Sequence, residues 1–163
     1  MFGLSEKSEN MSSFPEHQRG EFVISADPAR LDLDVIHTFL TNCYWAKGIP
    51  REVVERSIEH SLCFGIYHVS GGQIGFARVI SDFATIAYLG DVFVLDSHRG
   101  RGLCKWMMEC IMQHPDLQGL RRWILLTRDA HGLYSKFGFT PLKAADRYME
   151  LHRPDVYKIG ETL

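Results

Sequence analysis

The residues best suited to chemistry in this sequence form one short turn, Arg99-Gly100-Arg101-Gly102-Leu103-Cys104. A β-branched and aromatic run precedes it, and apolar residues at helical spacing follow it, which predicts a strand, a glycine-bearing turn and a helix. Backbone N–H groups converge at such a turn, the helix dipole adds positive charge, and glycine lets a ligand approach without a Cβ in the way. The pattern predicts a site for phosphate or pyrophosphate.

Two common phosphate-binding motifs are excluded by the same residues. A dinucleotide-binding G-x-G-x-x-G motif needs a third glycine at the position that Lys105 occupies. A G-x-x-x-x-G-K-[ST] loop occurs nowhere in the sequence, which argues against nucleotide hydrolysis at a loop of that kind.

Alternating strands and helices must position this turn. Apolar spacing and turn residues predict helices over residues 27–40, 50–58, 102–113 and 130–136, and strands over 22–25, 63–69, 73–80, 84–95 and 122–127. Tight connections make the strands between 63 and 95 an antiparallel meander. Segments 139–142 and 147–151 are expected to close the sheet as an antiparallel pair, before a terminal arm over 153–163.

Two motifs in this order resemble the GNAT superfamily of N-acetyltransferases. Arg99-x-x-Gly102-x-Cys104 is similar to the family signature [RQ]-x-x-G-x-[GA], which binds the pyrophosphate of acetyl-coenzyme A. Ala130-x-x-Leu133-Tyr134-x-x-x-Gly138-Phe139 resembles the segment in which a tyrosine faces the sulfur of the coenzyme. The chain departs from the family pattern at Cys104, where glycine or alanine is usual, and at Thr127, where many members carry asparagine.

The resemblance, which covers residues 22–151, implies a fold and a coenzyme site. We expect an α+β (mixed α/β) fold with a central, mostly antiparallel, splayed sheet of about six or seven strands flanked by about four helices. Residues 21–163 would form a single domain, after a flexible, polar tail over residues 1–20. The implied cosubstrate is acetyl-CoA, with no metal, and the implied coenzyme-binding residues are Phe93, Val94, Leu95, Asp129 and the turn from Arg99 to Cys104.

An acyl thioester is already activated toward amines, which limits the chemistry that the protein must supply. The enzyme has to hold a neutral amine against the carbonyl carbon, stabilise the oxyanion and protonate the leaving thiolate. A strand N–H left unpaired near Phe93 or Val94 would stabilise the oxyanion, and Tyr134 is the phenol best placed to protonate the sulfur.

Deprotonating the amine needs a base, and Asp91 lies on the strand that would border the acetyl group. Strand alternation would turn Asp91 and Val94 to opposite faces. The alternative bases are Glu55, His60, His131 and a chain of water molecules, and the alternative role for Asp91 is a structural carboxylate paired with an arginine.

The loop between the first two predicted helices carries Tyr44 and Trp45, which we expect to line the acceptor pocket. The function predicted is acetyl transfer from acetyl-CoA to a primary amine of a small molecule, by direct attack in a ternary complex. Two alternatives use the same fold: acetylation of protein or peptide lysines or N-termini, and a sensor that binds acyl-CoA without turnover. Tyr134 favours turnover, because a sensor needs no acid at the sulfur.

Composition sets the remaining expectations. The chain has 163 residues, a formal net charge of −2 and a pI near 6.4, which argues against nucleic acid or an anionic membrane as partner. Its four cysteines form no C-x-x-C pair, so we expect free thiols and a cytoplasmic location. No apolar stretch approaches the roughly 20 residues that span a bilayer. A monomer and a homodimer both remain open.

Overall fold

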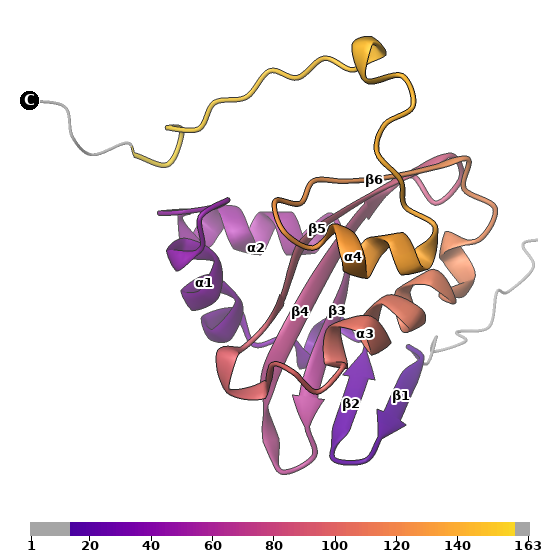
Figure 1. Cartoon of the computed structure of the whole chain (residues 1–163). Helices are drawn as coiled ribbons and strands as arrows, with labels where there is room; N and C mark the ends of the chain where they lie inside the picture. The colour runs from indigo at the N-terminus through magenta and orange to yellow at the C-terminus, as the bar shows by residue number, and fades with distance from the viewer. Residues whose placement is uncertain (1–13, 159–163) are drawn as a thin grey trace, which may run out of the picture.

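The computed structural model describes residues 14–158, and its core is one six-stranded sheet (Figure 1). The strands lie side by side in chain order, antiparallel from β1 to β5 and parallel between β5 and β6. They span β1 Glu16–Arg19, β2 Phe22–Ser25, β3 Leu62–His68, β4 Gly71–Ser81, β5 Ile86–Val94 and β6 Arg122–Leu125. The four α-helices of the described chain are α1 Leu33–Asn42, α2 Arg51–Glu59, α3 Leu103–Met112 and α4 His131–Tyr134. The predicted mixed, mostly antiparallel fold is confirmed.

Helices cover both faces of this sheet, with α1 and α2 on one side and α3 and α4 on the other (Figure 1). Each face has its own apolar cluster. Under α3 the cluster includes Trp106, Met107 and Ile111, and under α1 it includes Ile36 and Leu40. Burial of such side chains stabilises by about 1.5–3 kcal/mol each. The two clusters fix the helices against the strands that carry the candidate site.

The sheet splays open between its two parallel strands. β6 pairs with β5 only from Ile86 to Leu89, whereas β5 continues to Val94. Beyond Leu89 the edge of β5 that faces β6 therefore has no strand partner within the described chain. In Figure 1 the turn before α3 lies at the lower end of this opening, and the segment that follows β6 lies at its upper end.

A β-bulge lies on β5 beside this opening. Phe76 pairs with Phe93 and Arg78 pairs with Gly90, so two residues of β5 oppose one residue of β4. Asp91, one of the two, has a φ of 53°, a conformation that non-glycine residues seldom adopt but that aspartate tolerates better than most. The bulge bends β5 at the start of its unpaired edge.

The N-terminal expectation needs a correction within its last residues. Residues 16–19, placed in the expected tail over 1–20, form β1 and pair with β2 as a hairpin. The side chain of Arg19 lies 4.8 Å from the centre of the Trp106 ring and bonds to Glu109, which ties the hairpin to α3. No local pattern in the sequence indicates this strand, because its residues are polar and mostly exposed and so show no apolar alternation. Residues 1–13 of the expected tail lie outside the described residues.

The expected closing strands over 139–142 and 147–151 are wrong. These residues join no sheet, and a short 3-10 turn, Ala145–Arg147, lies between them. Met149 and Leu151 are 98% and 83% exposed, so the segment has no buried face to hold it as a strand. It leaves the body of the protein after α4 and runs outward before it returns (Figure 1). The predicted helix over 130–136 is also shorter, since α4 ends at Tyr134 and a 3-10 turn, Ser135–Phe137, follows.

Candidate active site

The turn predicted to bind phosphate has open space in front of it. Gly100 and Gly102 have φ values of 76° and 71°, the left-handed region that glycine adopts without strain. A Cβ built at either glycine would meet no atom within 4 Å. Gly102 caps α3, and no side chain of the described residues bonds to the free N–H groups of that helix's first turn. These are the features that a phosphate cradle requires.

Arg99 fastens the turn to the end of β5. Its Nε donates a hydrogen bond of 3.1 Å to the Val94 carbonyl oxygen, and its Nη1 pairs with Asp96 at 3.0 Å. Arg101 lies instead near the ring of Phe22 on β2, 5.9 Å from its centre. The two arginines of the turn therefore differ: Arg99 holds the loop in place, and Arg101 extends toward the β1–β2 hairpin.

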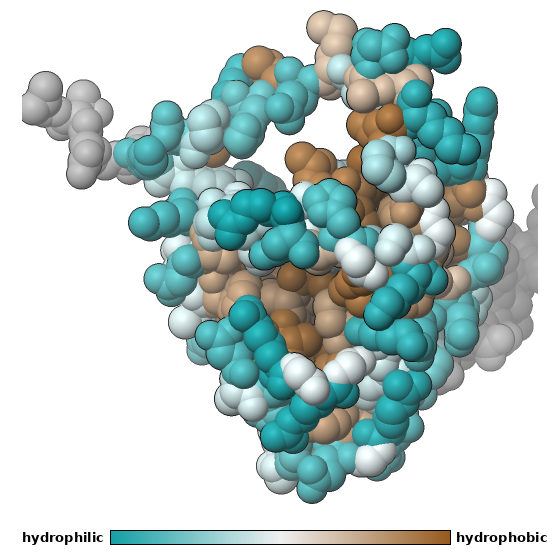
Figure 2. Space-filling view, viewed as in Figure 1, coloured by the Kyte–Doolittle hydropathy of each residue, from teal (hydrophilic) through white to brown (hydrophobic). Residues whose placement is uncertain are grey.

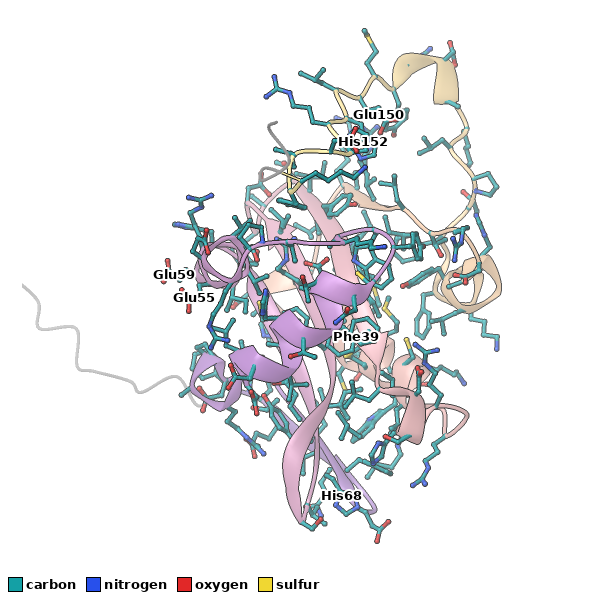
Figure 3. The ribbon with its side chains drawn as sticks, turned by 90° about the vertical axis from the view of Figure 1, so that its left-hand side faces the viewer. Phe39, Glu55, Glu59, His68, Glu150 and His152 are labelled. Carbon is teal, nitrogen blue, oxygen red and sulfur yellow. The ribbon has the colours of Figure 1, made fainter. Side chains whose placement is uncertain are left out.

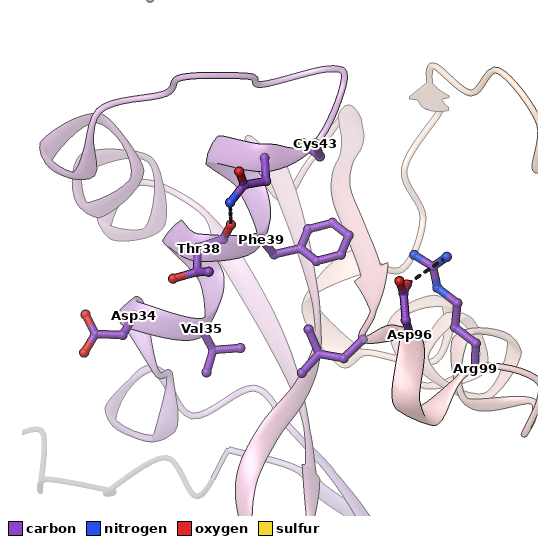
Figure 4. Close-up of a pocket in the computed structure, with 9 residues that line it drawn as sticks. Asp34, Val35, Thr38, Phe39, Cys43, Asp96 and Arg99 are labelled. Atoms are coloured by element: carbon purple, nitrogen blue, oxygen red, sulfur yellow. Dashed lines mark hydrogen bonds and ion pairs between the residues drawn. The ribbon is translucent and has the colours of Figure 1, made fainter.

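An apolar groove of about 640 Å³ adjoins this turn (Figure 4). It lies between α1 and the end of β5, and Figure 2 shows apolar side chains exposed in the hollow between the two helical layers. Phe39 on α1 lines it and stacks on Phe93, with ring centres 3.8 Å apart. The other lining residues are Asp34, Val35, Thr38, Asn42, Cys43, Leu95, Asp96 and Arg99. Two predicted coenzyme residues, Leu95 and Arg99, thus open onto the groove.

Tyr134 is 8% exposed, and it packs against Phe139. Burial raises the pKa of its phenol above the ordinary value, and the nearby Cys104, Tyr44 and Asp129 add to the shift. The phenol therefore stays protonated at neutral pH and is able to donate a proton. Burial also raises the pKa of the Cys104 thiol, which packs against the cluster under α3. Cys104 is a small apolar residue here rather than a thiolate.

Thr127 has a structural task where many family members carry asparagine. Its Oγ1 accepts a hydrogen bond of 3.0 Å from the backbone N–H of Ala130, which begins α4. The bond fixes the approach of α4 to β6 and so the position of Tyr134 at the end of that helix. Asp129, an expected coenzyme residue, is exposed on the same loop.

Asp91 is held by two donors. Oδ2 accepts a bond of 2.7 Å from Nε of Arg78, and Oδ1 accepts one of 3.1 Å from Nε1 of Trp45. Its side chain is 13% exposed. Because both oxygens accept hydrogen bonds, the geometry favours the structural alternative for Asp91 over proton abstraction. Of the alternative bases, Glu55 lies 3.6 Å from Arg51 and points outward from α2 with Glu59 (Figure 3).

The loop between α1 and α2 is attached on both sides of the opening. Trp45 bonds to Asp91 on β5, and the guanidinium carbon of Arg128, after β6, lies 3.9 Å from the centre of the Tyr44 ring. Sequence reasoning missed Arg128, Arg78 and Phe39. For Arg128 a signal existed, because ligands of parallel sheets bind beyond the carboxyl ends of the strands, and Arg128 follows β6. For the other two no local signal existed, since their partners lie far away in the sequence.

Comparison with known proteins places this arrangement in a family. The family model of the acetyltransferase (GNAT) domain matches residues 59–141. A candidate acetyltransferase of Gibberella zeae, FG08082, is 33% identical, over 72% of this chain and 78% of that protein. The crystal structure of a candidate GNAT acetyltransferase from Xanthomonas campestris pv. campestris is 55% identical, with a TM-score of 0.81 over 83% of this chain and 96% of that one. The chain belongs to the GNAT acetyltransferase family.

A more distant structure shares the fold and contains the coenzyme of the family. It is a candidate acetyltransferase of Clostridium acetobutylicum with acetyl-CoA, 14% identical, with a TM-score of 0.56 over 80% of this chain and 94% of that one. Within residues 14–158, no group of three or more histidine, cysteine or acidic side chains is arranged to hold a metal ion. None of the helices described has the length and apolarity needed to cross a membrane.

Proposed function

We propose that this protein transfers the acetyl group of acetyl-CoA to a primary amine of a small molecule, by direct attack in a ternary complex. The observation that carries the proposal is the opening between β5 and β6, which has an open glycine turn at one end and the protonated phenol of Tyr134 on α4 beside it. A phosphate site and a proton donor along one opening suit a long phosphorylated thioester.

The residues of the turn fit the phosphates of the coenzyme. The open space at Gly100 and Gly102 leaves room for a pyrophosphate against the N-terminus of α3. The coenzyme would supply an acetyl group already activated as a thioester. Leu95 and the groove beside it offer an apolar wall for the pantetheine arm, with Phe93 and Val94 on the adjoining segment of β5.

The chain's own groups then handle the protons and the carbonyl oxygen. Beyond Leu89 the unpaired edge of β5 offers backbone N–H groups to the thioester oxygen, and the bulge at Asp91 lies on this segment. Tyr134 donates its phenolic proton to the leaving sulfur. Because both carboxylate oxygens of Asp91 accept hydrogen bonds from Arg78 and Trp45, we assign removal of the ammonium proton to water. The water would enter from the side of the opening where the amine binds.

Release of free thiol from acetyl-CoA with a panel of primary amines tests this function. We expect thiol release that depends on an amine and on Tyr134. Calorimetric binding of acetyl-CoA without acetylation of any amine or of lysine peptides would favour a sensor, and acetylation of peptides alone would favour a protein acetyltransferase. We propose that residues 21–163 form a single domain that uses acetyl-CoA and no metal. The assay uses the full chain, because β1 precedes this domain and is part of its sheet.

A further inference from the structure

Arg128, which lies over Tyr44 of the α1–α2 loop, has no acidic partner among the described residues. Arg128 takes part in no ion pair or side-chain hydrogen bond with another described residue, whereas Arg78 and Arg99 beside the same opening each pair with an aspartate. Its guanidinium lies over the ring of Tyr44, 3.9 Å from the ring centre. The contact with a ring face orients the guanidinium and uses none of its N–H groups as hydrogen-bond donors in the plane of the group, so these donors remain available.

The position of Arg128 is on the acceptor side of the candidate site. The segment after β6 lies at the end of the opening opposite the glycine turn (Figure 1). Tyr44, on which Arg128 rests, is close enough to Tyr134 to raise the pKa of that phenol further. Arg128 and Tyr44 therefore border the place where the sulfur, the proton donor and the amine would meet.

The loop beneath Arg128 is preorganised. Trp45 contacts the neighbouring Tyr44 edge to face, with ring centres 5.0 Å apart. Its indole N–H bonds to Asp91, and Asp91 also accepts a hydrogen bond from Arg78. A guanidinium on a fixed platform binds carboxylate or phosphate through two parallel N–H bonds at little ordering cost. A surface arginine on a mobile loop would lack that advantage.

From these contacts we infer that the amine acceptor carries an acidic group, a carboxylate or a phosphate, and that Arg128 binds it. The inference rests on the proposed function and adds the class of acceptor to it. The acidic group would anchor one end of the substrate on Arg128, while the amine at the other end faces the thioester. Tyr44 acts as a positioning residue, because it sets the orientation of the guanidinium.

Matched acceptors that differ only in the acidic group test this inference. 4-Aminobutyrate is compared with 4-aminobutyramide, and phosphoethanolamine with ethanolamine, which separates carboxylate from phosphate. In the wild type we expect kcat/KM to be higher by about tenfold or more for the acid in at least one pair. Arg128→Gln should abolish that preference and leave the neutral member unchanged within about twofold, and Arg128→Lys should keep part of it. Tyr44→Leu should raise KM for the acid more than it lowers kcat.

The control is Arg121→Gln. Arg121 is an exposed arginine just before β6 that has no assigned role in the site, so this variant removes the same charge elsewhere. An equal loss for acid and neutral amine in Arg128→Gln, or a wild type without preference for either acid, overturns the inference. Calorimetric binding of the same four compounds, with coenzyme A present, gives a readout that needs no turnover. Binding of an acid that depends on Arg128 without any acetylation overturns the proposed function alone, whereas acetylation without such dependence overturns the acidic-acceptor inference alone.

Discussion

The indole of Trp45 donates a hydrogen bond of 3.1 Å to the carboxylate of Asp91, 46 residues further along the chain. Sequence reasoning assigned these residues separate tasks, the first as acceptor pocket and the second as base. The bond joins them, and Arg78 completes the unit from β4. The carboxylate thereby holds the α1–α2 loop over the edge of β5, and its influence on catalysis would pass through the loop.

Replacement of Asp91 by asparagine separates the two roles. Asp91→Asn removes the charge paired with Arg78 and keeps the side-chain shape, so we expect unfolding free energy to fall by about 3 kcal/mol, because a largely buried arginine loses its partner. We expect KM for the amine to rise with little change in kcat or in its pH profile. Denaturant unfolding and initial rates measure both. If the rate of Asp91→Asn no longer rose with pH as the wild-type rate does, Asp91 would be the base after all.

Glu16→Gln provides the matched control for this change. Glu16 pairs with Arg30, but its side chain is half exposed, so removal of its charge should alter stability by about 0–1 kcal/mol. The hydrogen bond to Arg30 lowers the pKa of the Glu16 carboxyl. Any contribution from this pair is present at neutral pH and is lost as the pH falls through the lowered value.

Gly102→Asp should abolish binding of acetyl-CoA. An aspartate there places a negative charge and a side chain into the open space before α3, where the pyrophosphate is proposed to bind. Calorimetry measures the affinity and circular dichroism checks the fold. Gly119→Asp is the matched control, because Gly119 has a φ of 74° and equally open surroundings, so both variants carry similar backbone strain. Equal affinity in the wild type and Gly102→Asp would contradict the coenzyme assignment.

Local patterns explain why the turn and the element order were predictable. The sequence from Arg99 to Cys104 is a strand, turn and helix start in adjacent residues, and its geometry depends on glycine conformations that the residue types already specify. The predicted splay likewise follows from the family motif. In contrast, the bulge at Asp91 depends on the register between β4 and β5, which no local spacing encodes.

In the C-terminal segment, local residue types predicted strands that the structure does not form. Residues 147–151 have the residue types of a strand, yet Met149 and Leu151 are exposed because no other part of the described chain packs on them. Strand propensity reflects fit to a pleated, half-buried surface, so it has no effect where no such surface is available. Arg128 was missed for a related reason. Its contact with Tyr44 joins two loops that are distant in sequence, and exposed arginines carry no periodic signal.

Tyr67→Phe should leave catalysis unchanged and stabilise the protein. The Tyr67 hydroxyl is buried without a hydrogen-bond partner among residues 14–158, and the ring packs over Gly65. An unsatisfied buried hydroxyl costs about 1–3 kcal/mol, so we expect its removal to raise the free energy of unfolding by about 1 kcal/mol. Chemical denaturation measures the change. A loss of stability would mean that the hydroxyl has a hydrogen-bond partner in solution, for example a buried water molecule.

Tyr134→Phe should lower kcat by about 100-fold or more, because the phenol is the proposed proton donor to the sulfur. The affinity for acetyl-CoA should change little, because the proposed pyrophosphate site consists of backbone groups of the glycine turn and the N-terminus of α3 and does not use this hydroxyl. The active form is protonated, and burial raises the pKa above its ordinary 10.0, so activity should not fall through Tyr134 until the pH exceeds that value. Tyr67→Phe is the matched control, because burial raises the pKa of that phenol too. Full turnover in Tyr134→Phe, with Tyr67→Phe also active, would show that the sulfur takes its proton from another donor.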